Sequence, residues 1–127
     1  MKPLLVRDVM TIGVPVCRDS EWCGAVLARL EKEGRGAEPV VVLDEAGRAC
    51  GWVDRDRMEA APMRLMGEVM DEDIPTVQPE MAVEAALELI RSRGVEWAFL
   101  MHDWPGPPRP AAMVSLTSIE EALHENI

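Results

Sequence analysis

An internal repeat with a period of 60 residues constrains the fold of this chain more than any other sequence feature. The stretch VRDVMT at 6–11 recurs as MGEVMD at 66–71, so that Met10 aligns with Met70 (70 − 10 = 60). The same displacement aligns Pro15 with Pro75, Ala25 with Ala85, Leu27 with Leu87 and Gly34 with Gly94. A register kept without a gap over this span indicates that one structural unit occurs twice.

The first copy begins with the pattern of a strand followed by a helix. VPVC at 14–17 is a short β run, and Asp19 and Ser20 have side-chain oxygens that suit a helix start. Apolar residues then recur at helical spacing, namely Cys23, Val26, Leu27 and Leu30. We expect this helix to bury one face and to end at Gly34 and Gly36.

A strand hairpin and a second helix follow in the first copy. VVVL at 40–43 is rich in β-branched residues and predicts a strand that is buried on both faces. DEAG at 44–47 predicts a hairpin turn, and residues 48–53 should return as the next strand. Residues 55–61 should form a short helix, so the predicted order is β-α-β-β-α.

The second copy repeats this order. PTVQ at 75–78 is the β run, and Pro79 suits the first turn of a helix, where its missing N–H is not needed. The apolar stripe of the helix consists of Val83, Ala86, Leu87 and Ile90. Gly94 should end this helix. The remaining elements are predicted as strands at 96–102 and 110–116 and a helix at 118–124.

The second hairpin loop and the size of each copy bear on the architecture. WPGPPRP at 104–110 is rich in proline, which lacks a donor, so this loop should lie outside the sheet. A half of this size buries too little apolar surface to be stable alone. We therefore expect an α/β fold in which two β-α-β-β-α repeats pack sheet against sheet as a pseudo-twofold pair. Residues 1–61 would hold the first repeat with the N-terminal segment, and 62–127 the linker and second repeat.

The charge and the apolar pattern exclude several classes of protein. A formal net charge of -10 at pH 7 argues against a general nucleic-acid binder and against binding to anionic membranes. We expect no membrane-spanning segment and no secretory signal, because no apolar run is long enough. Cys17, Cys23 and Cys50 cannot all pair internally, and small apolar core residues of this kind fit a reducing compartment. The expected location is cytoplasmic.

No pattern typical of catalysis or of metal binding occurs in the sequence. There is no Walker A loop and no G-x-G-x-x-G stretch. The spacing of Cys17, Cys23, His102 and His124 matches no zinc pattern. Cys17 and His102 fall on predicted β segments with nothing to orient them as nucleophile and base. The sequence therefore predicts no enzyme, no catalytic residue and no metal site.

The order of the motifs resembles a known family. V-x-D-V-M-T, a short β run, an alanine-containing helix, P-V-V-V-x-D-x-x-G and G-h-h (h, apolar) together are similar to a tandem pair of CBS (cystathionine-β-synthase) domains, a Bateman module. The resemblance extends from about Val6 to Leu123. It implies a regulatory homodimer that binds an adenosine-containing ligand (AMP, ADP, ATP or S-adenosylmethionine) in a cleft between the repeats. It also implies regulation of another domain or protein and no other cofactor.

The ligand signature of the family is G-h-h-[Ser/Thr]-x-x-Asp. In it, the Ser or Thr hydroxyl contacts the phosphate of the ligand, and the Asp accepts hydrogen bonds from both ribose hydroxyls. GWVDRDR at 51–57 places Asp54 at the hydroxyl position and Arg57 at the Asp position. Arginine has donors only, so Arg57 cannot replace the ribose-binding carboxylate, and Asp54 would repel phosphate. If the first copy has a one-residue deletion, Asp56 takes the ribose role. Arg57 could instead bind a phosphate or another anion.

The second copy keeps more of this signature. AMVSLTS at 112–118 retains the hydroxyl in Ser115, but Ser118 replaces Asp. Trp97 stands where the family usually has a proline beside the adenine cleft, and it could stack on a base, fill the core or a dimer surface, or block the cleft. The predicted ligand residues are Asp54, Asp56, Arg57, Glu96, Trp97, Ser115 and Ser118. The alternative hypothesis is a ligand-free dimerisation or docking module with degenerate nucleotide sites.

Overall fold

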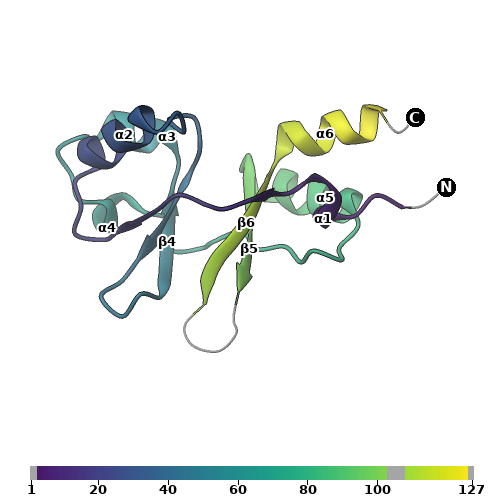
Figure 1. Ribbon diagram of the computed structural model, residues 1–127, viewed down its shortest axis with the longest axis horizontal. Helices are drawn as coiled ribbons and strands as arrows, with labels where there is room; N and C mark the ends of the chain where they lie inside the picture. Colours follow the sequence, from purple (N-terminus) through teal and green to yellow (C-terminus); the bar gives the residue numbers. More distant parts are fainter. Residues whose placement is uncertain (1–2, 103–107, 126–127) are drawn as a thin grey trace. The chain divides into compact units, whose positions relative to one another are not determined.

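The computed structural model describes residues 3–102 and 108–125, which divide into two compact units. The first-repeat unit comprises residues 14–74 with 108–109, and the second-repeat unit comprises residues 3–13, 75–102 and 110–125 (Figure 1). The division at residue 61 expected from the sequence assigned the N-terminal segment to the first repeat and the linker to the second. In the structure, each of these two segments groups with the other repeat.

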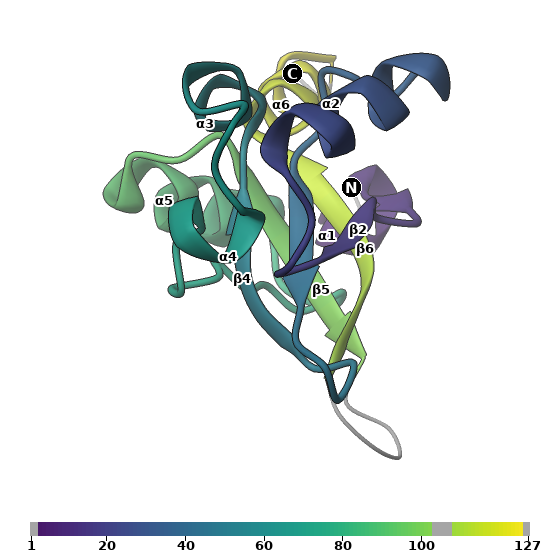
Figure 2. The ribbon, with the colours of Figure 1, turned by 90° about the vertical axis from the view of Figure 1, so that its left-hand side faces the viewer.

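The first-repeat unit is built from β2 (Val16–Arg18), α2 (Cys23–Lys32), β3 (Val40–Leu43), β4 (Ala49–Val53), α3 (Arg55–Ala60) and α4 (Met66–Val69). The strand order is β2-β3-β4, with β2 parallel to β3 and β3 antiparallel to β4. The elements from β2 to α3 follow the β-α-β-β-α order that the sequence predicts. α2 and α3 lie side by side (Figures 1 and 2), and Arg55 of α3 forms an ion pair with Glu31 of α2 at 2.7 Å.

The second-repeat unit is built from α1 (Val6–Val9), β1 (Thr11–Ile12), α5 (Val83–Arg93), β5 (Trp97–His102), β6 (Arg109–Ser115) and α6 (Leu116–Glu125). Its sheet has the order β1-β6-β5, and β1 runs antiparallel to β6. The later strands and the last helix therefore lie within two residues of their predicted bounds. Most of the proline-rich loop lies outside the described residues, and so does Trp104.

The β run expected at 75–78 and the helix start expected at Pro79 are both corrected by the structure. Thr76 makes a single parallel bridge to Phe99, and residues 75–78 do not form a strand. The chain turns at Pro79, which has no N–H for the sheet, and α5 begins only at Val83.

The start of α2 also differs from the expectation. Asp19 and Ser20 do not cap this helix, which begins at Cys23. The N–H groups of Cys23 and Gly24 instead donate to backbone carbonyls of the segment 62–64, at 2.9 and 3.0 Å. Because these donors are already satisfied, the helix needs no side-chain cap.

Short helix α1 is fixed to the start of α5 by backbone hydrogen bonds. The Val6 N–H donates to the Met81 carbonyl at 2.9 Å, and the Val83 N–H donates to the Leu4 carbonyl at 3.1 Å. This pairing explains why the N-terminal segment belongs to the second-repeat unit.

Short helix α4 repeats this arrangement in the first-repeat unit. The Met66 N–H donates to the Glu21 carbonyl at 2.8 Å, and the Cys23 N–H donates to the Arg64 carbonyl at 2.9 Å. Each partner is displaced by 60 positions from its counterpart (66 − 6, 81 − 21, 83 − 23, 64 − 4). The duplication read from the sequence is therefore present in the backbone hydrogen bonds.

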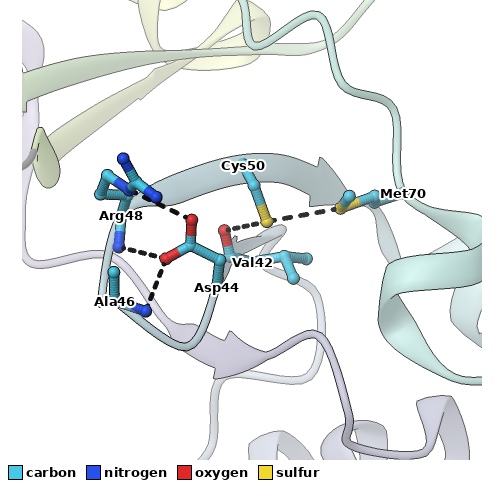
Figure 3. A network of polar contacts seen from close by, with 6 residues as sticks. All are labelled: Val42, Asp44, Ala46, Arg48, Cys50 and Met70. Carbon is cyan, nitrogen blue, oxygen red and sulfur yellow. Dashed lines mark hydrogen bonds and ion pairs between the residues drawn. The ribbon is translucent and has the colours of Figure 1, made fainter.

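The predicted turn between β3 and β4 is confirmed and is held by one carboxylate (Figure 3). Asp44 Oδ1 accepts hydrogen bonds from the N–H groups of Ala46 and Arg48, both at 2.9 Å. Gly47 has a φ of 80°, a conformation that glycine adopts without strain. The helix stops predicted at Gly34 and Gly94 are confirmed as well, with φ values of 75° and 65°.

Each unit has its own apolar core. The first-repeat core contains Cys17, Cys23, Val26, Leu30, Val40, Val42, Val53, Met58 and Met66. The second-repeat core contains Val6, Val77, Val83, Ala86, Ile90, Ala98, Leu100, Ala112, Val114 and Ile119. Val41, on the other face of β3, is also fully buried, which confirms that this strand is buried on both sides.

Candidate functional site

The seven residues predicted to bind a ligand fall into two groups. Asp54, Asp56 and Arg57 lie at the start of α3 in the first-repeat unit, and Glu96, Trp97, Ser115 and Ser118 lie near the starts of β5 and α6 in the second-repeat unit. The inter-repeat cleft that the resemblance implies stays a prediction.

Two of the three first-repeat residues have structural roles. Asp54 is the N-cap of α3, and its Oδ1 accepts a hydrogen bond from the Arg57 N–H at 2.9 Å. This bond satisfies one of the free donors of the helix start. The Arg57 guanidinium donates through Nη1 to the Val69 carbonyl at 3.1 Å and so connects α3 to α4. Asp56 is exposed in the first turn and forms no hydrogen bond or ion pair with the described residues.

Ser115 and Ser118 form the corresponding helix start in the second-repeat unit. Ser115 Oγ accepts a hydrogen bond from the Ser118 N–H at 3.0 Å, and the Ser115 hydroxyl donates to Ser118 Oγ at 2.8 Å. Ser118 therefore keeps its own hydroxyl hydrogen for an external acceptor. Asp54 and Ser115 thus play the same role, because each caps the residue three positions later.

Glu96 and Trp97 lie close to this helix start. The Leu116 N–H donates to the Glu96 carbonyl at 2.8 Å, which joins the segment before β5 to the first residue of α6. Trp97 is half-buried as the first residue of β5, whereas the Glu96 side chain is exposed. The structure therefore brings the four second-repeat residues to one region of their unit.

A cavity of about 500 Å³ lies beside Ser118 within the second-repeat unit. It is lined by Leu4, Asp8, Val9, Ser118, Glu121, Ala122 and Glu125. We call it the α1–α6 cavity, because these residues come from α1 with its preceding segment and from α6. None of the seven lining residues is basic, and three are acidic.

Sequence reasoning missed the acidic lining of this cavity. Glu121 and Glu125 are exposed residues of α6, and both line the cavity. The signal was present, because residues three, four and seven positions after Ser118 share one face of a helix. Asp8 carried no such signal, since it lies beside α6 only because the N-terminal segment groups with the second-repeat unit.

The cysteine thiols are poorly suited to nucleophilic chemistry. Burial raises the pKa of the Cys17 thiol to about 12, and burial also raises the pKa values of Cys23 and Cys50. These thiols are therefore protonated at neutral pH, and the protonated form is a weak nucleophile. Within residues 3–102 and 108–125, no three His, Cys, Asp or Glu side chains are grouped to hold a metal ion.

Among the helices of residues 3–102 and 108–125, none combines the length and the apolar character needed to cross a membrane.

One sequence comparison and several structural comparisons identify related proteins. Residues 66–125 match the family model described as the CBS domain. No curated protein matched the amino-acid sequence. The CBS domain pair of protein MJ0100, in complex with 5′-methylthioadenosine and S-adenosyl-L-methionine, has a TM-score of 0.83 at 14% identity. That alignment covers 99% of this chain and 100% of the other.

Two further structures are similar. The conserved CBS domain protein TA0289 from Thermoplasma acidophilum has a TM-score of 0.79 at 18% identity, over 94% of this chain and 69% of that one. The cytosolic domain of the Mg²⁺ channel MgtE, in complex with ATP, has a TM-score of 0.74 at 19% identity. The match covers 91% of this chain but only 47% of the MgtE domain, so this chain spans about half of that structure. The chain has the fold of a tandem CBS domain pair, and residues 66–125 match the CBS domain model by their sequence as well.

Proposed function

We propose that this chain is a regulatory CBS-pair module that binds an adenosine-containing ligand such as AMP, ADP, ATP or S-adenosylmethionine. One observation carries the proposal: the fold matches, over the full length of both chains, a CBS pair that holds 5′-methylthioadenosine and S-adenosyl-L-methionine. The module would have no catalytic activity of its own and would change the activity of another domain or protein.

The arrangement around Ser118 supports this proposal. The α1–α6 cavity contains one residue of the expected ligand signature, and that residue has a free hydroxyl hydrogen. Leu4, Val9 and Ala122 supply apolar surface to the same cavity. Ligand sites typically combine such apolar walls with a few polar groups that fix orientation.

Calorimetric titration of the intact chain tests the proposal. The ligands would be S-adenosylmethionine, 5′-methylthioadenosine, AMP, ADP and ATP. We expect Ser118→Ala to weaken binding about three- to tenfold, because one hydrogen bond contributes about 0.5–1.5 kcal/mol. Thr117→Ala, at the exposed neighbouring position, is the matched control and should leave affinity unchanged. If neither calorimetry nor a thermal shift detects any of these ligands at millimolar concentration, the proposal is wrong.

A second candidate function is a ligand-free dimerisation or docking module. Specific observations favour it: Asp54 and Ser115 cap helices, and Arg57 binds the Val69 carbonyl. Trp22 and Met63 are also 54% and 82% exposed, although large apolar side chains usually avoid water. Under this candidate the chain forms the same homodimer in light scattering with and without nucleotide. A mass that changes with nucleotide would favour ligand sensing instead.

The remaining expectations about partners belong to the same proposal. We propose that the module is a cytoplasmic homodimer that binds neither nucleic acid nor membranes. Its net charge of -10 supports this, because both of those surfaces are strongly anionic.

A further inference from the structure

We propose that the α1–α6 cavity selects among adenosyl ligands by charge and takes neutral or cationic ones, such as 5′-methylthioadenosine or S-adenosylmethionine, in preference to adenine polyphosphates. This inference rests on the proposed function, because it assumes that an adenosyl ligand occupies the cavity beside Ser118. It goes further by naming the ligand class that the lining would accept.

The charge of the lining comes from carboxylates without basic neighbours in the cavity. Asp8 is held in place by a hydrogen bond from the Leu5 N–H to its Oδ2 at 2.9 Å. Glu121 and Glu125 lie four positions apart on α6 and form no ion pair with the described residues. Two like charges at this spacing repel each other, so a cation between them would be favoured.

No basic residue of α1, α5 or α6 lines the cavity. Arg91 of α5 is engaged by Glu120, at 3.2 Å, on a part of α6 that does not line the cavity. Arg7 and His124 lie on α1 and α6, but neither is a lining residue. A phosphate in the cavity would therefore meet carboxylates and no cationic partner among the lining residues.

The expected size of the effect follows from simple electrostatics. Unit charges about 8 Å apart in water interact with roughly the thermal energy, and physiological salt reduces this further. ATP adds several negative charges facing three carboxylates, while S-adenosylmethionine adds a net positive charge. We expect ATP to bind at least about tenfold more weakly than 5′-methylthioadenosine at low salt, and the difference to shrink at high salt.

The test is a calorimetric series without divalent cations, in which 5′-methylthioadenosine, S-adenosylmethionine, AMP and ATP are titrated at low and high salt. The double variant Glu121→Gln, Glu125→Gln should narrow the difference between ATP and 5′-methylthioadenosine several-fold. Glu120→Gln on the same helix is the matched control, because Glu120 faces Arg91 and lies outside the lining. Melting curves would confirm that each variant is folded.

The outcomes separate this inference from the proposed function. Binding of ATP as tight as that of 5′-methylthioadenosine would overturn charge selection and leave the proposed function standing. A difference that the double variant does not reduce, or that Glu120→Gln reduces equally, would also overturn it. Failure of every adenosyl ligand to bind would instead contradict the proposed function and the inference with it.

Discussion

The two units share a backbone pattern but fill it with different side chains. Four matched core positions hold sulfur-containing residues in the first-repeat unit and aliphatic residues in the second. Cys17 corresponds to Val77, Cys23 to Val83, Met66 to Val6 and Met58 to Ile119 (77 − 17, 83 − 23 and 66 − 6 give 60; 119 − 58 gives 61). The backbone hydrogen bonds at 60-residue displacement are nevertheless kept. The fold therefore depends on volume and apolar character at these sites more than on residue identity.

The starts of α3 and α6 also keep one structural role while the side chain differs. Asp54 and Ser115 stand there at the hydroxyl position of the ligand signature. Asp54 and Ser115 differ in charge and size, yet each accepts the N–H three residues later. Capping alone thus accounts for an oxygen-bearing side chain at this position. Ligand binding needs additional features, such as the α1–α6 cavity beside Ser118 in the second-repeat unit.

The strongest test of the comparison removes one matched core residue from each unit. Leu30 and Ile90 are equivalent (90 − 30 = 60), and each is at most 2% exposed. Truncation of either to alanine should cost about 2–5 kcal/mol, because it removes buried methyl groups and leaves a cavity. Urea denaturation of Leu30→Ala and Ile90→Ala would measure both. A loss confined to one variant would show that the two cores do not support the fold equally.

A smaller effect is expected where the two units differ at one strand position. Gly51 of β4 corresponds to Ala112 of β6, and a Cβ added at Gly51 would lie 2.5 Å from Met70 Sδ and 3.0 Å from the Asp71 carbonyl oxygen. Asp71 is paired with the backbone of Trp52 at 2.9 and 3.0 Å. Gly51→Ala should therefore cost about 1–3 kcal/mol by displacing this segment.

The Cys50–Met70 contact gives Gly51→Ala a local readout. Cys50 Sγ lies 3.8 Å from Met70 Sδ (Figure 3), and the Trp52 indole N–H donates to the Asp73 carbonyl at 3.2 Å. Displacement of the segment should expose Cys50 to thiol reagents and change the Trp52 fluorescence. A Gly51→Ala protein that is as stable as the wild type, with unchanged reactivity, would show that the segment can shift without cost.

The capping residues should give a third, more modest effect. Asp54→Ala and Ser115→Ala each remove the acceptor for one N–H at a helix start and should cost about 1 kcal/mol. Asp54→Ser and Ser115→Asp exchange the two caps and should restore most of this stability. Thermal melts of the four variants would measure the differences. If the exchanged caps fail to restore stability, the side chains at 54 and 115 are not equivalent in role.

Local chemistry explains which parts of the fold could be predicted. The turn at Asp44, the helix stops at Gly34 and Gly94, and the order of elements depend on residues that are close in sequence. The start of α2 depends on residues that are distant in sequence, because its first N–H groups donate to carbonyls about forty residues later, at 62–64. A reading based on Asp19 therefore predicted a side-chain cap that the structure does not need.

Some residues of the candidate site could likewise be predicted from the local sequence, and others could not. Ser115 and Ser118 could be placed together because they lie three positions apart at a helix start. Asp8 lies 110 positions from Ser118 (118 − 8) and lines the same cavity only because the N-terminal segment joins the second-repeat unit. The contribution of Asp8 to the charge of the cavity was therefore not accessible from local patterns, whereas the spacing of Glu121 and Glu125 on α6 was.

The ion pair between Glu21 and Arg29 of the first-repeat unit has no counterpart in the second. The Glu21 carboxylate accepts hydrogen bonds from the Arg18 N–H at 2.7 Å and from Arg29 Nη1 at 2.6 Å. The equivalents of Glu21 and Arg29 are Met81 and Leu89 (81 − 21 and 89 − 29 give 60), so the second-repeat unit has no such pair. Partial burial acts to raise the pKa of Glu21, but the hydrogen bonds from Arg18 and Arg29 outweigh it and lower the pKa below 4.5.

This difference predicts the smallest effect, a pH-dependent one. Because the pKa of Glu21 is lower in the folded chain, its stabilising contribution is present above about pH 4.5 and is lost as the pH falls through the folded pKa. Glu21→Gln should cost up to about 1 kcal/mol at pH 7, since the pair is partly exposed. Its difference from the wild type should shrink toward pH 3. The loss caused by Met81→Gln at the matched position should not vary with pH, because no carboxylate is removed. Urea denaturation across this range measures both, and a Glu21→Gln difference that stays constant would show that the carboxylate charge contributes nothing.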